Sequence, residues 1–190
     1  MKSVILASGS PRRKELLKLL FDDFKIEVSK KDETLPKSIS AEKIPEYLSF
    51  IKGEDIAKEN PQSLVISADT IVLLNGEILG KPKDKTDAFK MLNSLSGNFH
   101  FVITGCSLFY NGKYKSFSVK TKVKFYKLNE AEISEYINSP EPYDKAGGYG
   151  IQSKGGLFVE FIEGDYNNVV GFPIAELKRE IRSFAPDFIK

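Results

Sequence analysis

In the first part of the chain, the spacing of apolar residues changes between that of a strand and that of a helix. Residues 2–7 form a short apolar run that predicts a strand, and the stretch SGSPRRKELL follows it. Ser10 and Pro11 in this stretch are typical of an N-cap and of the first position of a helix. The next apolar residues recur at helical spacing and predict the buried side of that helix: Leu16, Leu17, Leu20 and Phe21. Alternation of apolar residues over 24–28 then predicts a second strand.

The rest of the pattern mixes helices, strands and hairpins. The helix that is expected to begin at Pro45 has these residues on its inner side: Leu48, Ile51 and Ile56. Asn75-Gly76 and Asn111-Gly112 each predict a type I′ turn between antiparallel strands. Further elements expected are helices over 87–95, 129–138 and 173–184 and a strand over 157–162. Strands that alternate with helices and also form hairpins predict an α/β fold with a mixed sheet.

Composition narrows the class of protein. The 190 residues are 41% hydrophobic and 28% charged, which suits one domain or two closely packed lobes. A net charge of +2 argues against a nucleic-acid binder that uses its whole surface, although it allows a local basic pocket. We expect no signal segment and no membrane span, because no apolar run is long enough. The single cysteine, Cys106, fits a reducing compartment, so the cytoplasm is expected.

The same composition limits the chemistry. One histidine, His100, and one cysteine leave too few ligands for a Cys/His zinc site. Catalysis is therefore expected to use Asp, Glu, Lys and Arg, which suit phosphate substrates and hard divalent cations. His100 itself is expected to be structural.

Two arginines follow Pro11 and raise a question. Arg12 and Arg13 stand in the first turn of a helix, where the macrodipole disfavours positive charge. The turn at Ser8, Gly9 and Ser10 and the helix N-terminus offer hydroxyls and backbone N–H groups to an anion, and arginine matches phosphate oxygens. The alternative is an exposed first turn with solvated arginines. The glycine and lysine spacing of a Walker A loop is absent.

Asp69 interrupts the apolar strand VISADTIVLL. A buried carboxylate there needs an ion pair, hydrogen bonds or a metal, unless the strand ends or has an exposed edge at this point. Thr70 is expected on the opposite face of the strand. Taken alone, Glu33, Lys52 and Lys81 are typical of solvated side chains.

A glycine-rich stretch, DKAGGYGIQ, ends at Gln152. Its three glycines let the backbone approach a ligand closely, and the Gln152 amide offers both a donor and an acceptor. The alternative is an ordinary turn.

Six stretches occur in order along nearly the whole chain: LASGSPRRKELL, SADTIV, LGKP, LSGNFHFVIT, DKAGGYGIQ and GDYNNVVGFPI. Together they resemble the Maf family of nucleoside triphosphate pyrophosphatases. The departures are Gly53 and Gly148, where alanine is usual, and Phe172, where leucine is usual. The resemblance implies a single Maf-like domain over residues 1–190. It also implies an elongated mixed sheet flanked by helices, with two lobes and a central cleft, similar to inosine triphosphatase.

The resemblance further implies the reaction and its residues. Hydrolysis of the α–β phosphoanhydride of dTTP and UTP, or of a modified pyrimidine nucleotide, would give the monophosphate and pyrophosphate with Mg²⁺ or Mn²⁺. Asp69 is implied as the general base and, with Glu33, as a metal ligand. The other implied residues are Ser8 and Arg13 at the phosphates, Lys52 and Lys81 as catalytic cations, and Arg12, Thr70 and Gln152 for dTTP and UTP rather than 7-methyl-GTP.

Two other functions stay open at this point. A Maf-like chain could sense nucleotides and regulate cell division or septum formation without turnover. The basic stretch KYKSFSVKTKVKFYK could bind nucleic acid, but alternating lysines and apolar residues are more typical of a half-exposed strand. We expect a nucleotide substrate, no nucleic acid and no membrane. A homodimer through the aromatic residues around Phe109, Tyr110 and Tyr114 also stays open.

Overall fold

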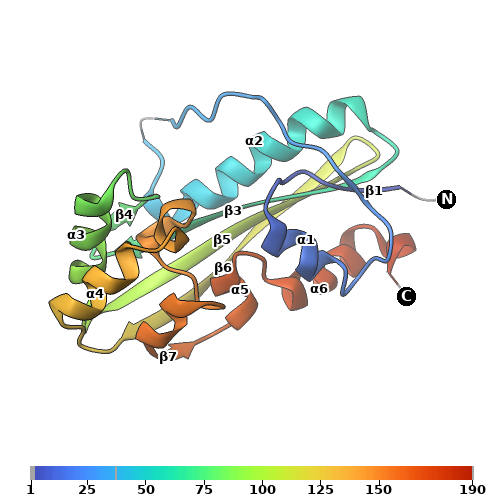
Figure 1. Cartoon of the computed structure of the whole chain (residues 1–190). Helices are drawn as coiled ribbons and strands as arrows, with labels where there is room; N and C mark the ends of the chain where they lie inside the picture. Colours follow the sequence, from blue (N-terminus) through green and yellow to red (C-terminus); the bar gives the residue numbers. More distant parts are fainter. Residues whose placement is uncertain (1–2, 37, 190) are drawn as a thin grey trace. The chain divides into compact units, whose positions relative to one another are not determined.

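A mixed sheet is the frame of the fold (Figure 1). The computed structural model describes residues 3–36 and 38–189, so the predicted strand residue Lys2 lies outside the described part. Within it, the seven strands follow the order β2-β1-β3-β5-β6-β7, and β4 pairs with β3. The strands are β1 (Val4–Leu6), β2 (Lys25–Ile26), β3 (Leu64–Leu74), β4 (Glu77–Leu79), β5 (Phe99–Tyr110), β6 (Lys113–Phe125) and β7 (Val159–Glu163). Because β1 runs parallel to β2 and β3 while β4 and β7 pair antiparallel, the predicted mixed α/β class is confirmed.

Two of the helices begin at capping signals that the sequence predicted. The helices are α1 (Pro11–Leu17), α2 (Ile44–Glu59), α3 (Lys85–Leu95), α4 (Glu130–Ile137), α5 (Tyr166–Val170) and α6 (Ile174–Phe184). Ser10 caps α1 by accepting from the Arg13 backbone N–H, and Asn129 and Glu132 form a reciprocal capping box on α4. Both predicted Asn-Gly turns have positive φ at the asparagine and the glycine. None of the helices in the described part of the chain is both long and apolar enough to cross a membrane.

Two predicted elements are wrong in extent or type. The strand expected over 24–28 has only two paired residues, Lys25 and Ile26, and Val28 is exposed. Between the strand expected over 157–162 and the helix expected over 173–184, the sequence predicted only a connecting loop, but this stretch contains the short helix α5. Both cases involve short segments, in which tertiary contacts outweigh the weak local pattern.

The chain divides into two compact units. The first unit takes Met1–Asp69, Thr104–Val119 and Gly171–Lys190, and the second takes Thr70–Ile103 and Lys120–Val170. The strands β3, β5 and β6 therefore each contribute residues to both units.

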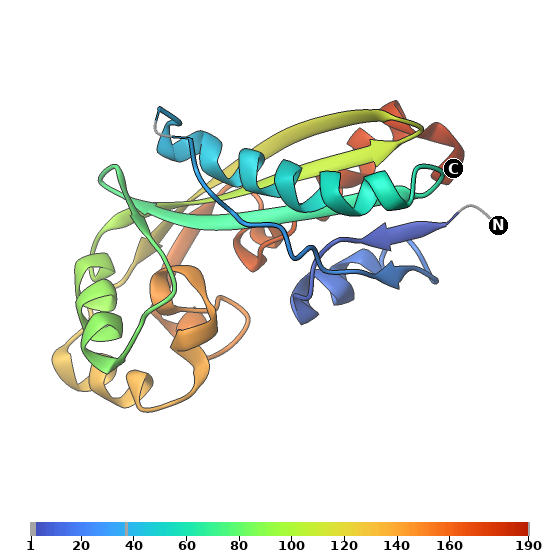
Figure 2. The same cartoon turned by 90° about the horizontal axis from the view of Figure 1, so that it is seen from above.

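The first unit has three layers, with α2 on one face of its strands and α1 and α6 on the other (Figures 1 and 2). Alternate residues of β1 and β3 point to opposite faces, as strand geometry requires. Val4, Leu6, Leu64 and Ile66 pack with Leu17 and with the buried residues of α6. The residues between them pack instead against α2: Ile5, Ala7 and Val65.

The inner side of α2 differs from the prediction. Leu48 and Ile51 are only half-buried, whereas the buried positions include Pro45, Ser49 and Gly53, at spacings of four, together with Ile56. A Cβ on Gly53 would lie 2.3 Å from Cε2 of Phe109 and 2.4 Å from Oγ of Ser67. The helix therefore approaches the sheet too closely for large side chains, and small residues form the contact.

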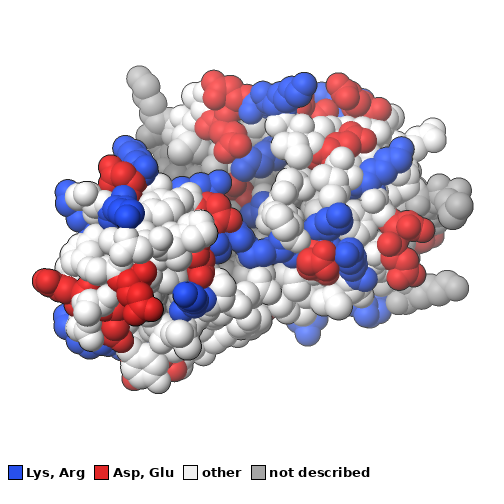
Figure 3. Space-filling model, viewed as in Figure 1, with Lys and Arg blue, Asp and Glu red and all other residues white. Residues whose placement is uncertain are grey.

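The outer side of α2 carries paired charges. Glu54 lies 2.8 Å from Lys31 and 3.3 Å from Lys58, and Lys43 pairs with Glu46 at 3.2 Å. Figure 3 accordingly shows basic and acidic side chains intermixed over this helix. Exposed pairs of this kind contribute about 0–1 kcal/mol each, so the small-residue contact on the inner side holds α2 in place.

The second unit has its own core, built where α3 and α4 pack against one face of the strands. Phe125, Tyr149 and His100 meet edge to face in this core, with ring centroids 4.8–5.4 Å apart. His100 is 1% exposed and its Nε2 lies 2.7 Å from the Tyr149 hydroxyl, in keeping with the expected structural role. Burial lowers the pKa of His100 to about 3, so the ring is neutral at physiological pH.

Candidate functional site

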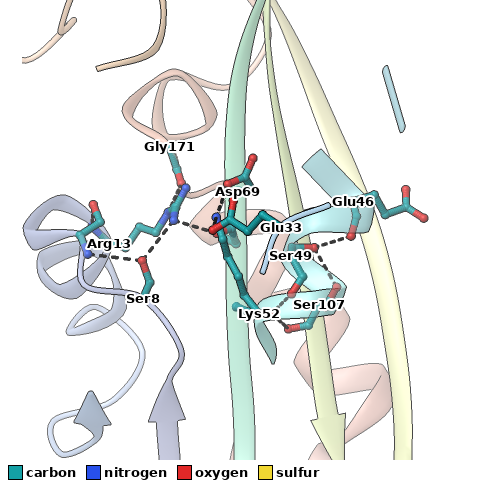
Figure 4. Close-up of polar contacts among 12 residues, drawn as sticks. Ser8, Arg13, Glu33, Glu46, Ser49, Lys52, Asp69, Ser107 and Gly171 are labelled. Carbon is teal, nitrogen blue, oxygen red and sulfur yellow. Dashed lines mark hydrogen bonds and ion pairs between the residues drawn. The ribbon is translucent and has the colours of Figure 1, made fainter. Parts of the chain in front are cut away.

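The centre of the site is a lysine held between two carboxylates (Figure 4). Nζ of Lys52 on α2 lies 2.6 Å from Oδ1 of Asp69 on β3 and 3.3 Å from Oε1 of Glu33. The side chains of Asp69 and Lys52 are 15% and 22% exposed, and that of Glu33 is 49% exposed. Asp69 thus interrupts its strand because it is ion-paired, which was one of the alternatives that the sequence left open.

Sheet topology explains why these residues come together. The neighbouring strands β2, β1 and β3 are parallel, so the residues after β2 and β1 emerge at the same edge of the sheet, beside the middle of β3. Ser8 follows β1, Glu33 lies in the segment after β2, and Asp69 lies beyond the part of β3 that pairs with β1. The carboxyl-end rule of open α/β sheets thus applies to this first unit.

A buried network of hydroxyls holds α2 against β3 beneath the ion pairs. The Ser67 hydroxyl donates to the Ser49 carbonyl oxygen at 2.6 Å, two residues before Asp69 and three before Lys52. The Ser49 hydroxyl in turn lies 2.8 Å from that of Ser107 (Figure 4). These serines were not predicted from the sequence, although small residues every four positions in α2 are a signal of a close helix–sheet contact at Ser49.

Arg13 joins three segments of the first unit. Its Nε donates to the Gly171 carbonyl at 2.9 Å, and its Nη1 donates to the Ala68 carbonyl at 2.8 Å and to the Ser8 hydroxyl at 3.1 Å (Figure 4). Burial lowers the pKa of Arg13, and the negative charge of Asp69 opposes this shift, so the guanidinium stays charged. The positive charge of Arg13, which the helix macrodipole disfavours, is therefore stabilised by the carbonyl oxygens of Gly171 and Ala68. The sequence did not predict these contacts.

The other predicted site residues fall into different places. Arg12 is half-buried in α1, next to Arg13 in the first unit. Thr70 follows Asp69 on β3, is half-buried, and belongs to the second unit. Lys81, after β4, and Gln152, in a turn, are exposed residues of the second unit. The structure thus groups Ser8, Arg13, Glu33, Lys52 and Asp69 in the first unit.

The donor set fits a hard divalent cation that is shared with a phosphate ligand. Among residues 3–36 and 38–189, no three His, Cys, Asp or Glu side chains are grouped as a metal site. Glu33 and Asp69, however, already share one cation, the Lys52 ammonium. One or two carboxylates are the usual protein contribution to Mg²⁺, which completes its shell with water and phosphate oxygens. That these two residues bind a metal stays a prediction.

The basic stretch that suggested nucleic acid is part of β6. Its lysines lie on aromatic rings of β5, with Nζ of Lys120 4.0 Å from the Phe101 centroid and Nζ of Lys122 4.3 Å from that of Phe99. Nζ of Lys124 donates to the Gly97 carbonyl. The alternation of lysine and apolar residues is thus explained by a half-exposed strand.

The fold and the site describe an α/β protein whose paired carboxylates and clustered cations suit a phosphate ligand and a hard metal ion. The chain belongs to the Maf-like protein family, whose model matches residues 3–184. It is similar to the dTTP/UTP pyrophosphatase of Bacillus cytotoxicus, with 49% identity over 184 residues, which cover 97% of this chain and 96% of the relative. The dTTP/UTP pyrophosphatase of Bacillus cereus strain G9842 is 48% identical over 187 residues and 98% of each chain. A solved structure, that of the Staphylococcus aureus Ham1 protein, is 20% identical with a TM-score of 0.47 over 65% of this chain and 72% of that one.

Proposed function

We propose that this chain hydrolyses dTTP and UTP to the nucleoside monophosphate and pyrophosphate. The observation that carries the proposal is the ion-paired group of Asp69, Lys52 and Glu33 beside the fixed guanidinium of Arg13. It occurs in a chain that shares about half of its residues with dTTP/UTP pyrophosphatases over nearly their whole length.

Cleavage of a phosphoanhydride needs a proton acceptor for the attacking water and positive charge near the leaving group. The Asp69 carboxylate is the proposed acceptor, because it is ion-paired, only 15% exposed and fixed on a strand. Lys52 holds that carboxylate in place and, with Lys81, offsets the negative charge that develops on pyrophosphate. Arg13 and Ser8 bind the phosphates.

Glu33 and Asp69 are the proposed ligands of a divalent cation. When bound, Mg²⁺ or Mn²⁺ would polarise phosphate oxygens and lower the pKa of the water. Glu33 is the more exposed of the two carboxylates and lies at the longer distance from Lys52. We therefore infer that Glu33 exchanges Lys52 for the metal more readily than Asp69 does.

Choice of the base is assigned mainly to Gln152 of the second unit. The Gln152 amide can accept from N3–H and donate to O4 of uracil or thymine, whereas cytosine presents an acceptor and a donor in the reversed order. Gln152 is exposed, as a residue that meets a substrate must be before binding. Arg12 and Thr70 are the further residues that we assign to recognition of the pyrimidine nucleotide.

The test is pyrophosphate release from a panel of nucleotides with Mg²⁺ or Mn²⁺. The panel contains dTTP, UTP, CTP, GTP, 7-methyl-GTP and modified uridine triphosphates, and it compares the wild type with Asp69→Asn. Metal-dependent release from dTTP and UTP is expected to fall about 10²–10⁴-fold in Asp69→Asn. The matched control is Asp55→Asn on α2, whose carboxylate accepts from Ser29 at 2.8 Å and which is expected to stay active.

Other outcomes of this assay separate the alternatives. Release from purine nucleotides alone would retain the enzyme class but reject the assigned specificity. Nucleotide binding without release from any member of the panel would reject the enzyme in favour of a nucleotide sensor.

A further inference from the structure

One carboxylate of the second unit collects an unusual number of hydrogen bonds. Glu141 opens a short 3-10 turn, Glu141–Asp144, that follows α4. Its Oε1 accepts from the Tyr136 hydroxyl at 3.0 Å, the Ser153 hydroxyl at 2.5 Å and the Gly155 N–H at 3.1 Å, and its Oε2 accepts from the Lys154 N–H at 3.2 Å. Three of the four donors thus come from residues 153–155.

These three residues directly follow Gln152. Residues 150–156 form the Gln152 loop, and its backbone–backbone hydrogen bonds are local: they run from Ser153 N–H to the Gly150 carbonyl at 3.3 Å and from Gly156 N–H to the Ser153 carbonyl at 2.9 Å. Bonds of this range shape a turn but do not attach it to the rest of the unit. The Glu141 carboxylate, which lies 12 to 14 residues away in the sequence, attaches residues 153–155 to the rest of the unit. The Tyr136 hydroxyl adds a hydrogen bond with the Gly150 backbone.

Packing at Gly155 agrees with a loop held close to Glu141. A Cβ on Gly155 would lie 2.8 Å from the Gly150 nitrogen and 2.9 Å from the Tyr136 hydroxyl oxygen, so only glycine fits here. Gly155 therefore packs closely against the Tyr136 hydroxyl, which also donates to Glu141.

The charge of Glu141 strengthens these bonds. Partial burial opposes ionisation, but the hydrogen bonds from Ser153, Gly155 and Tyr136 outweigh it, and the pKa of Glu141 lies below its ordinary value. The group is thus ionised at neutral pH, and hydrogen bonds to a charged acceptor are roughly twice as strong as neutral ones.

We infer that Glu141 is a positioning residue for substrate selection: its carboxylate holds residues 153–155 in the conformation that presents Gln152 to the pyrimidine base. This inference rests on the proposed function and on the role of Gln152 in it. Glu141 itself does not need to contact the substrate. Its loss is expected to change which nucleotide is chosen, with a much smaller effect on the rate of cleavage.

The experiment is a double-mutant cycle of Glu141→Gln and Gln152→Ala, measured as kcat and KM for UTP and CTP. In Glu141→Gln, the amide N–H₂ must face at least one donor from which the carboxylate accepts, and the remaining hydrogen bonds lose the negative charge. The attachment of the loop is therefore weakened. The UTP/CTP ratio of kcat/KM is expected to fall about tenfold to 100-fold, mainly through KM, because small displacements of a positioning group have effects of this size. In the Gln152→Ala background, Glu141→Gln is expected to leave the remaining ratio unchanged.

The matched control is Glu132→Gln, which removes another carboxylate of the same unit that accepts a backbone N–H, from Asn129 at 2.8 Å. It is expected to lower stability slightly and to leave the UTP/CTP ratio intact. Ser153→Ala removes one donor to Glu141 and serves as the second variant if Glu141→Gln does not fold; a ratio that falls a few-fold supports the inference.

Three results would overturn it. The first is a UTP/CTP ratio of kcat/KM that Glu141→Gln leaves unchanged. The second is an effect of Glu141→Gln on this ratio that is equally large in the wild type and in the Gln152→Ala background. The third is a ratio that Gln152→Ala does not alter. Absence of pyrophosphate release in the wild type would instead reject the proposed function itself.

Discussion

The charged site of the first unit and the Gln152 loop of the second unit are built in opposite ways. Lys52 and Asp69 are mostly buried, and they stand on a helix and a strand that a small-residue contact holds together. Gln152 is exposed, in a turn attached mainly through one carboxylate. Phosphate chemistry is common to all nucleotides, whereas the base differs. We therefore expect the first region to tolerate little change and the second to set the specificity.

The largest effect is expected from Lys52→Met. It retains an apolar stem of similar length but leaves Asp69 and Glu33 as two unneutralised carboxylates next to the triphosphate. kcat/KM is expected to fall about 10²–10³-fold for UTP and CTP alike, the range found when one electrostatic donor is removed from an active site. The control is Lys58→Met on the exposed side of the same helix, where Lys58 pairs with Glu54 at 3.3 Å and activity is expected to stay. Equal activity of the two variants would contradict the assigned role of Lys52.

The second effect concerns the loop. Gln152→Ala is expected to raise KM for UTP about tenfold to 100-fold, to remove the preference over CTP, and to change kcat by less than about threefold. Steady-state kinetics with both nucleotides measure this. A loss of kcat that is the same for UTP and CTP would place Gln152 in the cleavage chemistry and would remove the contrast between the two regions.

Gly53→Ala tests the close contact on which the first region depends. The added Cβ would lie 2.3 Å from Cε2 of Phe109 and 2.4 Å from Oγ of Ser67, so these side chains or the helix must shift, at about 1–3 kcal/mol of unfolding free energy. A chain of this size should then lose roughly 2–12 °C in Tm, and activity should fall as Lys52 moves from Asp69. Gly80→Ala is the control, because nothing lies within 4 Å of its Cβ. Equal Tm values for the two variants would contradict the close contact.

The smallest effect at neutral pH, which grows only as the pH falls, concerns the core of the second unit. The pKa of His100 is about 3 in the folded chain and about 6.5 when exposed, so between these values the unfolded chain binds the extra proton. The contribution of the neutral His100 ring to the free energy of unfolding is fully present above pH 6.5. It is lost as the pH falls toward 3, by up to about 1.4 kcal/mol per pH unit. Urea unfolding at several pH values should therefore show a shallower acid decline in His100→Gln, whose side chain does not titrate. Parallel declines in the two proteins would exclude His100 as the cause.

Local features of the fold followed from neighbouring residues alone. Ser10 with Pro11, the Asn129 and Glu132 pair, and the two Asn-Gly turns each form within four residues, so their structures depend little on the rest of the chain. The order of predicted strands and helices along the chain also predicted the α/β class, because each element is recognised from its own local pattern. The identity of the charged residues, and the family resemblance, supplied the candidate site.

Only the tertiary structure decided which of these residues meet and what holds them. Lys52 pairs with Asp69 across 17 positions and Arg13 bonds Gly171 across 158, and no local pattern marks either partner. For the buried side of α2, Ile56 was predicted correctly but Leu48 and Ile51 were not, because periodicity follows large apolar residues, whereas a close helix–sheet contact selects small ones such as Gly53. Nothing in the local sequence distinguishes Glu141 from an ordinary surface glutamate, and only the folded chain places residues 153–155 at its carboxylate. Capping and turn formation are short-range, so sequence determines them directly, but ion pairs and packing depend on which distant segments share a sheet edge or a helix face.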